Sequence, residues 1–235
     1  MSGPVALVGS GEYLPVMEAV ERRLLDGRPP VFVQLATAAA PEGVKSLARW
    51  HALGRKSAER LGVQQVVVPV VDRISADDPA LAGLIEGAGL VYLSGGNPPF
   101  LAATLRGTAV WAAIETAWRA GASLAGCSAG AMALGLRVPD IRHVLRGTEE
   151  GLAAVPQLSV IPHFDRLAAR MPDFVLNAVT QAPDGVTIVG IDEDTALVGG
   201  PDDWEVMGRQ QVWVLTADGR KGYAAGEQLH LPTLS

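Results

Sequence analysis

Short runs of aliphatic and β-branched residues alternate along the chain with longer stretches in which apolar residues recur every three or four positions. Runs of the first kind predict strands, and stretches of the second kind predict helices. This alternation is typical of a mostly parallel sheet covered by helices on both faces, a three-layer α/β sandwich. We expect strands at 5–8, 31–35, 66–70, 90–93 and 122–125, and helices at 13–25, 44–61, 80–86 and 108–119.

The pattern loosens after residue 134, where polar and turn-forming residues become frequent. Further strands are expected at 158–161, 186–191 and 195–198, and a helix at 167–181. Segments 205–207 and 211–215 predict a small antiparallel hairpin that closes the C-terminal end. The chain shows no internal repeat, low-complexity stretch or linker, so we expect a single domain over 1–235.

Residues Gly126-Cys127-Ser128-Ala129-Gly130 follow a predicted strand and match the G-x-S-x-G pattern of a nucleophile elbow. In such a turn the serine hydroxyl projects above the sheet, and the flanking glycines prevent steric overlap. The alternative is a plain strand-to-helix turn in which Ser128 only caps a helix. The strand before the motif and the small residues after it favour Ser128 as a nucleophile.

A serine nucleophile needs a base and an acid that orients the base. His163 follows an apolar strand, and catalytic side chains of open sheets gather at the carboxyl ends of strands. The strand at 186–191 ends in Asp192-Glu193-Asp194, which supplies three candidate acids, with Asp140 and Asp165 as less well placed ones. The competing order Ser128, Asp192, His230 is that of an α/β-hydrolase. We prefer His163 because His230 lies in a short apolar stretch near the C-terminus.

Two glycine-rich turns follow other predicted strands. The backbone N–H groups of Ala129, next to Ser128, and of Gly96, in Ser94-Gly95-Gly96-Asn97, are candidates for an oxyanion hole. Gly9-Ser10-Gly11 resembles part of a dinucleotide-binding fingerprint, but Leu14 replaces the third glycine. A glycine-lined cleft near the active site is therefore the preferred interpretation, and we expect no cofactor.

Composition narrows the class of protein further. Hydrophobic residues make up 49% of the chain, which favours a folded globule, and the net charge of −6 without a basic cluster argues against nucleic-acid binding. No apolar run approaches a membrane span or a signal sequence, and the single cysteine, Cys127, fits a reducing compartment. We therefore expect a cytoplasmic protein, with no metal site suggested by the spacing of His, Cys and Asp.

Four motifs occur in the order Ser94-Gly95-Gly96-Asn97, Gly126 to Ala131, Pro162-His163-Phe164 and Gly190-Ile191-Asp192-Glu193. In this order the chain resembles the serine peptidase family of dipeptidase E and cyanophycinase over roughly positions 5 to 200. The resemblance implies a fold similar to class I glutamine amidotransferases, with serine in place of their cysteine.

The resemblance implies Ser128 as nucleophile and His163 as base. Glu193 matches the glutamate of both family branches, whereas Asp192 is matched only in the cyanophycinase-like branch. The acid of the dipeptidase branch has also been placed at an aspartate that would correspond to Asp140. Glu193 is our choice.

The two branches differ in substrate: dipeptidase E removes N-terminal aspartate from small peptides, and cyanophycinase cuts a β-linked Asp-Arg polymer. Pro162 stands where cyanophycinases have glutamine, and their arginine-rich segment is reduced to Arg166 and Arg170. We expect a peptidase for short peptides, aspartyl dipeptides among them, with Asn97, Arg166 and Arg170 as substrate-binding residues.

Two other functions remain open at this point. One is a small-ester or amide hydrolase that uses Ser128 and His230, and the other is a binding protein of the same fold without hydrolytic activity. A symmetric homodimer is an expectation from the frequency of such dimers alone.

Overall fold

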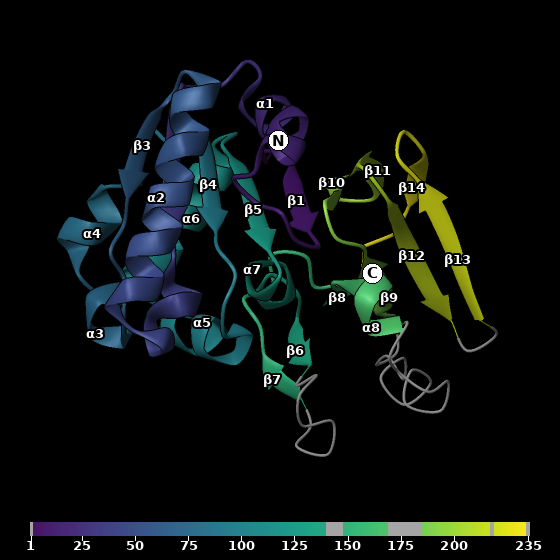
Figure 1. Cartoon of the computed structure of the whole chain (residues 1–235). Coiled ribbons are helices and arrows are strands. Elements are labelled where there is room, and N and C mark those ends of the chain that lie inside the picture. Colours follow the sequence, from purple (N-terminus) through teal and green to yellow (C-terminus); the bar gives the residue numbers. More distant parts are fainter. Residues whose placement is uncertain (1, 140–147, 169–184, 217–218, 234–235) are drawn as a thin grey trace.

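The computed structural model describes residues 2–139, 148–168, 185–216 and 219–233, and an eight-stranded sheet forms its centre (Figure 1). Five neighbouring strands, in the order β1-β5-β4-β2-β3, run parallel to one another. Three antiparallel strands, β10, β11 and β14, extend the sheet beyond β1. The bounds are β1 Val5–Val8, β2 Val31–Leu35, β3 Gln64–Val67, β4 Leu90–Leu93, β5 Ser123–Cys127, β10 Thr195–Gly199, β11 Asp203–Gly208 and β14 Gln228–His230.

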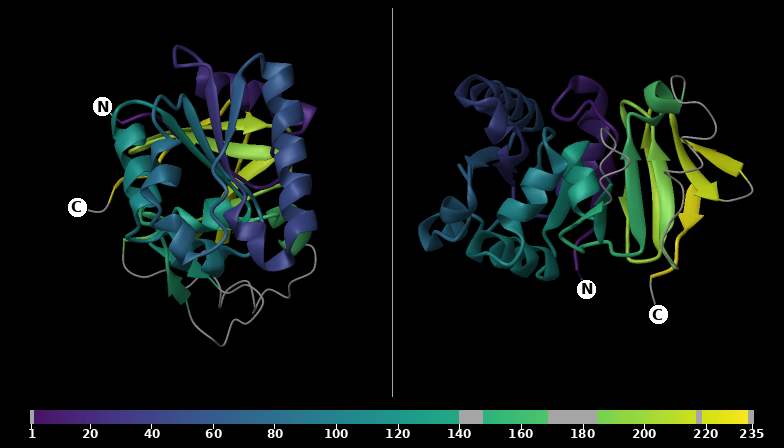
Figure 2. Two further views of the ribbon diagram at one scale, coloured as in Figure 1. Left: turned by 90° about the vertical axis from the view of Figure 1, so that its left-hand side faces the viewer. Right: turned by 90° about the horizontal axis from the view of Figure 1, so that it is seen from below.

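Helices cover both faces of the parallel part of this sheet because successive side chains of each strand point to opposite faces. On one face, Ala6, Val8 and Tyr92 pack with side chains of α1 (Glu18–Leu25) and α2 (Val44–Leu61). The opposite face packs against α5 (Pro98–Leu105), α6 (Ala109–Arg119) and α7 (Ala129–Ala133). Figure 2 (left) shows α2 and α6 on opposite sides of the sheet. The other helical segments before β5 are η1 Pro15–Met17, η2 Thr37–Glu42, α3 Arg73–Ala76 and α4 Pro79–Gly83.

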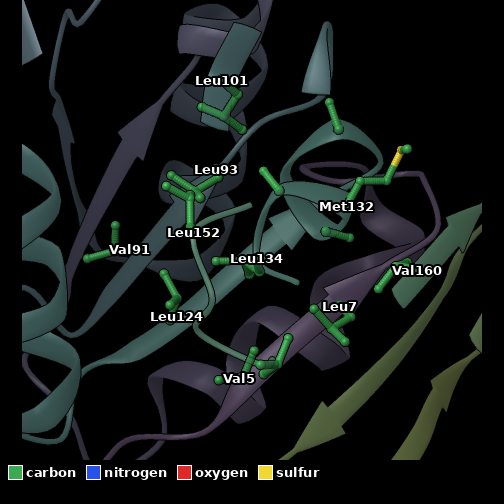
Figure 3. Close-up of a cluster of buried hydrophobic side chains, with 14 of the residues drawn as sticks. Val5, Leu7, Val91, Leu93, Leu101, Leu124, Met132, Leu134, Leu152 and Val160 are labelled. Carbon is green, nitrogen blue, oxygen red and sulfur yellow. The ribbon is translucent and has the colours of Figure 1, made fainter. Parts of the chain in front are cut away.

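The core between the sheet and the second helical layer consists mainly of aliphatic side chains (Figure 3). Leu7, Leu93, Leu101 and Leu134 are completely buried there. Burying one such side chain contributes about 1.5–3 kcal/mol, so this layer supplies much of the driving force for folding. It also fixes α7 against the sheet, and α7 begins directly after Ser128.

A second sheet, in the order β13-β12-β9-β8, packs beside β10. Its strands β8 and β9 are parallel, and β12 pairs antiparallel with both β9 and β13. The short helix α8 (Phe164–Ala168) follows β8, and β6 and β7 form a separate two-stranded ribbon. The bounds are β6 Arg137–Pro139, β7 Thr148–Glu150, β8 Leu158–Pro162, β9 Thr187–Ile191, β12 Gln211–Thr216 and β13 Gly219–Ala224.

The predicted fold class is confirmed: helices lie on both faces of a central sheet, and antiparallel strands follow at the C-terminal end. The predicted pairing of 205–207 with 211–215 is wrong, because β11 joins β10 and β14 in the large sheet while β12 joins the small one. The C-terminal hairpin is formed by β12 and β13 instead. Of the helix predicted at 167–181, the part beyond 168 lies outside the described residues.

Other element predictions differ in their bounds. No helix includes Tyr13, because its φ of 66° does not fit an α-helix, and the rest of the segment 13–25 forms η1 and α1. The strand predicted at 66–70 lies earlier, as β3, and α5 was not predicted. Among the described residues, none of the helices combines the length and the apolar character that a membrane span requires.

Candidate active site

Ser128 occupies a sharp turn between β5 and α7, at the carboxyl end of a central parallel strand (Figure 1). Its backbone has φ 49° and ψ −106°, in a region that residues other than glycine rarely adopt. A Cβ at Gly126 would overlap the backbone of Gly130, and a Cβ at Gly130 would overlap the carbonyl of Leu93. Both glycines are therefore sterically required, as predicted from the G-x-S-x-G pattern.

His163 bridges Ser128 and Glu193. Its Nε2 lies 3.1 Å from Ser128 Oγ, and its Nδ1 lies 3.0 Å from Glu193 Oε1. With the proton on Nδ1, the imidazole donates to the carboxylate and its Nε2 accepts from the serine hydroxyl. These three residues, which the sequence predicted as nucleophile, base and acid, thus form one continuous chain of hydrogen bonds.

The topology explains why residues so distant in sequence meet. Ser128 follows β5 in the large sheet, whereas His163 and Glu193 follow the parallel strands β8 and β9 of the small sheet. Gly9, at the end of β1, allows the two sheets to approach, since a Cβ there would overlap the carbonyls of residues 191 and 192. The Gly9-Ser10-Gly11 turn thus packs closely against the turn that carries Glu193, and a glycine-lined cleft stays a prediction.

Glu193 is held on several sides. Its Oε2 accepts from Arg166 Nη2 at 2.7 Å, and its backbone N–H donates to Asp165 Oδ1 at 3.0 Å. Gln210 Nε2 donates to its carbonyl at 2.9 Å. The side chain of Glu193 is only 20% exposed, so these contacts define its position next to His163.

Asp192, the competing acid on the same strand end, bonds elsewhere. Its Oδ1 accepts from Trp213 Nε1 at 3.0 Å and its Oδ2 accepts from the Gln211 N–H at 3.2 Å, both on β12. Burial is the main reason why the pKa of its carboxyl lies above the ordinary value. Asp192 therefore links β9 to β12, and the geometry at His163 favours Glu193.

The histidine loop is supported by an aromatic contact. Phe164, directly after His163, is buried and packs against Trp213, with ring centroids 6.0 Å apart. Gly190 leaves the space for it, because a Cβ at this position would lie 2.5 Å from the Phe164 ring. Arg220 lies over the Trp213 ring at 5.1 Å from the centroid. This packing holds α8 against the small sheet.

The predicted oxyanion-hole residues flank Ser128. Ala129 is the first residue of α7, so its N–H has no acceptor within the helix. A Cβ built on Gly95 would lie 3.6 Å from Ser128 Cβ, which places the turn containing Gly96 beside the serine. Gly96 has a φ of 144° and packs on the carbonyl of Ala38.

Of the predicted substrate-binding residues, Asn97 is exposed and its Oδ1 caps α5 by accepting from the Phe100 N–H at 3.0 Å. Arg166 is 66% exposed and pairs with Glu193. Arg170 and the alternative acid Asp140 lie outside the described residues. Substrate binding by these side chains stays a prediction.

The alternative base, His230, does not lie near Ser128. It is on β14, four strand steps from β5, which is roughly 19 Å at about 4.8 Å per step. Its Nδ1 lies 2.9 Å from Asp203 Oδ1, at an exposed position. The interpretation that pairs Ser128 with His230 is therefore wrong.

Glu12 was not singled out from the sequence, yet it is a buried acid beneath this site. It is 5% exposed, and its two carboxylate oxygens accept from the Cys127 thiol and from the Gly95 N–H. Burial, opposed by weaker hydrogen-bond effects, raises its pKa. Burial and the neighbouring Glu12 raise the pKa of the Cys127 thiol as well, so this cysteine stays protonated. In the sequence, the position of Glu12 shortly after β1, at the carboxyl end of that strand, was the signal that could have identified it.

Within the described ranges, no three His, Cys, Asp or Glu side chains are grouped as ligands for a metal ion.

The chain resembles known proteins in sequence and in structure. Its mostly parallel central sheet with antiparallel strands at the C-terminal end is consistent with the class I glutamine amidotransferase-like fold expected from the sequence. The chain belongs to peptidase family S51, whose family model matches residues 42–206. The crystal structure of a peptidase from an acI-B1 Actinobacterium is similar, with a TM-score of 0.90 and 40% identity, covering 98% of this chain and 97% of the other.

Two more distant proteins are also similar. A proposed peptidase E from Listeria monocytogenes EGD-e shares the fold, with a TM-score of 0.60 and 19% identity over 89% of this chain and 98% of the other. A cyanophycinase from Geminocystis herdmanii (strain PCC 6308) is 28% identical over 167 residues. That alignment includes 63% of this chain and spans 57% of the length of the cyanophycinase.

Proposed function

We propose that this protein is a serine peptidase that hydrolyses short peptides, aspartyl dipeptides among them, with Ser128, His163 and Glu193 as its catalytic triad. The observation that carries the proposal is the position of His163, within 3.1 Å of Ser128 Oγ and 3.0 Å of Glu193 Oε1. Membership in peptidase family S51 gives the same reaction class.

In the proposed reaction, Ser128 Oγ attacks the carbonyl carbon of the peptide while His163 Nε2 takes the hydroxyl proton. Glu193 stabilises the imidazolium that forms, because Nδ1–H donates to its carboxylate. His163 then gives the proton to the leaving amine, and the C–N bond breaks. A water molecule, deprotonated by His163, hydrolyses the acyl-enzyme ester and restores Ser128.

The tetrahedral intermediate carries a negative charge on the former carbonyl oxygen. The N–H groups of Ala129 and Gly96 are proposed to donate to it. The first turn of α7 supports this role for Ala129, and the contact of the Gly95 position with Ser128 supports it for Gly96. A single donor of this kind contributes about 10²- to 10³-fold to kcat.

For the substrate, we propose that Arg166 binds a carboxylate next to the triad, with Asn97 and Arg170 as further binding residues. A guanidinium carries five N–H donors, so its pairing with Glu193 leaves donors for a second carboxylate. Its 66% exposure supports access from solvent. The aspartyl side chain is the carboxylate that an aspartyl dipeptide offers.

The test is a digest of a dipeptide and tripeptide library read by mass, with aryl esters as a second substrate panel. Cleavage of peptides with N-terminal aspartate, absent with Ser128→Ala, is the expected result. Arg166→Ala is expected to raise KM for these peptides about 10-fold or more, whereas Arg209→Ala, an equally exposed arginine paired with Asp194, leaves KM unchanged. If the aryl esters are hydrolysed while the peptides stay uncleaved, the proposal is contradicted.

A further inference from the structure

The carboxyl of Glu12 connects the two backbone segments that border Ser128. Its Oε2 accepts from Cys127 Sγ at 2.7 Å, and Cys127 is the last residue of β5, directly before Ser128. Its Oε1 accepts from the Gly95 N–H at 3.1 Å, and Gly95 directly precedes Gly96. One side chain thus bonds to both neighbours of the proposed oxyanion hole.

The space around Gly95 shows how close these groups are. A Cβ at this position would lie 3.2 Å from Glu12 Oε1 and 3.6 Å from Ser128 Cβ. The Gly95 backbone therefore lies close to both Glu12 and Ser128. A shift of the Gly95 backbone changes the distance between the N–H groups of Gly96 and Ala129.

Desolvation raises the pKa of the Glu12 carboxyl, so burial opposes a negative charge at this position. The Cys127 thiol and the Gly95 N–H each donate to one of its oxygens, and these two bonds fix the side chain between β5 and the glycine turn.

We infer that Glu12 is a positioning residue of the active site, whose carboxyl fixes the Gly95–Gly96 turn to the end of β5 and so sets the geometry of the oxyanion hole. The inference rests on the proposed function, because it requires Ser128 to be the nucleophile. Glu12 does not itself touch the substrate.

The chain contains a matched control. Glu21 is also buried, at 2% exposure, and its carboxylate also accepts from a backbone N–H (Tyr13, 2.9 Å) and from a side chain (Ser57 Oγ, 2.6 Å). These partners bind it to Tyr13 and α2 rather than to β5 or Gly95. Changes at Glu21 therefore reproduce the loss of a buried carboxyl whose own side chain bonds to neither wall of the proposed oxyanion hole.

The experiment measures kcat, KM and the thermal midpoint for Glu12→Asp, Glu12→Gln, Glu21→Asp and Ser128→Ala, on the peptide that the library digest shows to be cleaved fastest. Aspartate is one methylene shorter and cannot keep both bonds unless the turn moves. Glu12→Asp is expected to lower kcat about 10- to 100-fold with KM within about threefold. Glu12→Gln keeps an acceptor for Gly95 and is expected to retain kcat within about threefold.

Glu21→Asp is expected to lower the thermal midpoint as much as Glu12→Asp while leaving kcat unchanged. If Glu12→Asp and Glu21→Asp have equal kcat while Ser128→Ala is inactive, the inferred role of Glu12 is overturned and the proposed function is not. Turnover by Ser128→Ala overturns the proposed function itself. If Glu12→Asp does not fold, Cys127→Ala removes the other end of the same link. A fall of about 3- to 10-fold in its kcat supports the role, and an unchanged kcat overturns it.

Discussion

At the scale of single residues, the site separates two adjacent acids. Glu193 Oε1 meets His163, whereas both oxygens of Asp192 accept from β12. An oriented carboxylate fixes the tautomer of the imidazole and stabilises its charged form. The proposed mechanism therefore requires the carboxylate of Glu193 beside His163, and it does not require the carboxylate of Asp192.

Glu193→Gln is expected to lower kcat about 10³- to 10⁴-fold with little change in KM, because an amide can favour the wrong tautomer of His163. The matched variant Asp192→Asn removes a carboxylate one position away and is expected to keep kcat within about threefold, with a small loss of stability. Steady-state kinetics of both variants on one peptide make the comparison. A large loss in Asp192→Asn with a mild one in Glu193→Gln would reverse the assignment of the acid.

Ser128, His163 and Glu193 could be selected from the sequence because each follows a recognisable strand, and strand ends of one direction gather at one edge. Glu12 also follows a strand, but a glutamate in a glycine-rich turn is usually solvated, and nothing in the sequence indicated its burial. Arg166 was expected as a substrate-binding residue, and its pairing with Glu193 was not predicted. Its 2.7 Å contact with Glu193 depends on the fold of α8 against β9, which spacing does not reveal.

At the scale of elements, the approach of β1 to the turn between β9 and β10 brings the acid to the serine. Gly9 lies where a side chain would overlap the carbonyls of residues 191 and 192, and its N–H donates to the Thr195 carbonyl at 2.9 Å. The two sheets can present their strand ends to one site only because this contact is made through backbone.

Gly9→Ala is expected to destabilise the protein by about 1–3 kcal/mol through overpacking and to lower kcat, since the turn with Glu193 must move. The control is Gly83→Ala at the end of α4, where a Cβ meets nothing within 4 Å. That change is expected to be neutral or to stabilise by up to about 1 kcal/mol. Chemical denaturation and steady-state kinetics give both quantities, and a Gly9→Ala protein with the stability and kcat of the parent would contradict the account.

The sequence predicted most strands and long helices because their apolar periodicity matches their burial. The helix α5 was not predicted, although it begins directly after the predicted turn Ser94-Gly95-Gly96-Asn97. Proline is in fact well suited to the first helical positions, and Asn97 caps the helix through Phe100. The elements β11 and β12 were recognised, but their adjacency suggested a hairpin, whereas β11 pairs with β10 and β14 and β12 pairs with β9 and β13.

At the scale of the whole molecule, buried carboxyls couple folding to pH. Burial is the largest cause of the raised pKa values of Glu12 and Glu21. A carboxyl whose pKa is higher in the folded state keeps its proton there after the unfolded chain has lost it. Stability then decreases as the pH rises through the interval from the unfolded pKa of about 4.3 to the folded pKa.

Glu21→Gln removes one such group while keeping an acceptor for the Tyr13 N–H. Relative to the parent protein, its free energy of unfolding is expected to increase as the pH is raised from about 4 towards neutrality. Urea denaturation at a series of pH values measures this difference. A difference that is constant with pH, or that decreases, would show that Glu21 is not held neutral by burial.

The architecture as a whole followed from the alternation of strands and helices, together with the order of four motifs. The division of the strands into two sheets did not, because it depends on long-range pairing such as that of β1 with β10. The same division determines the site, since the nucleophile comes from one sheet and the base and acid from the other.

The central claim is that Ser128 is the nucleophile of a peptidase, and the kcat of Ser128→Ala tests it most directly. Ser94→Ala is the matched control, because Ser94 is a buried serine after the neighbouring strand β4, with its Oγ 2.8 Å from the Tyr13 hydroxyl. The account predicts a fall in kcat of about 10⁴-fold or more for Ser128→Ala at unchanged fold, and a kcat within about threefold of the parent for Ser94→Ala. Peptide turnover that survives in Ser128→Ala would contradict the account.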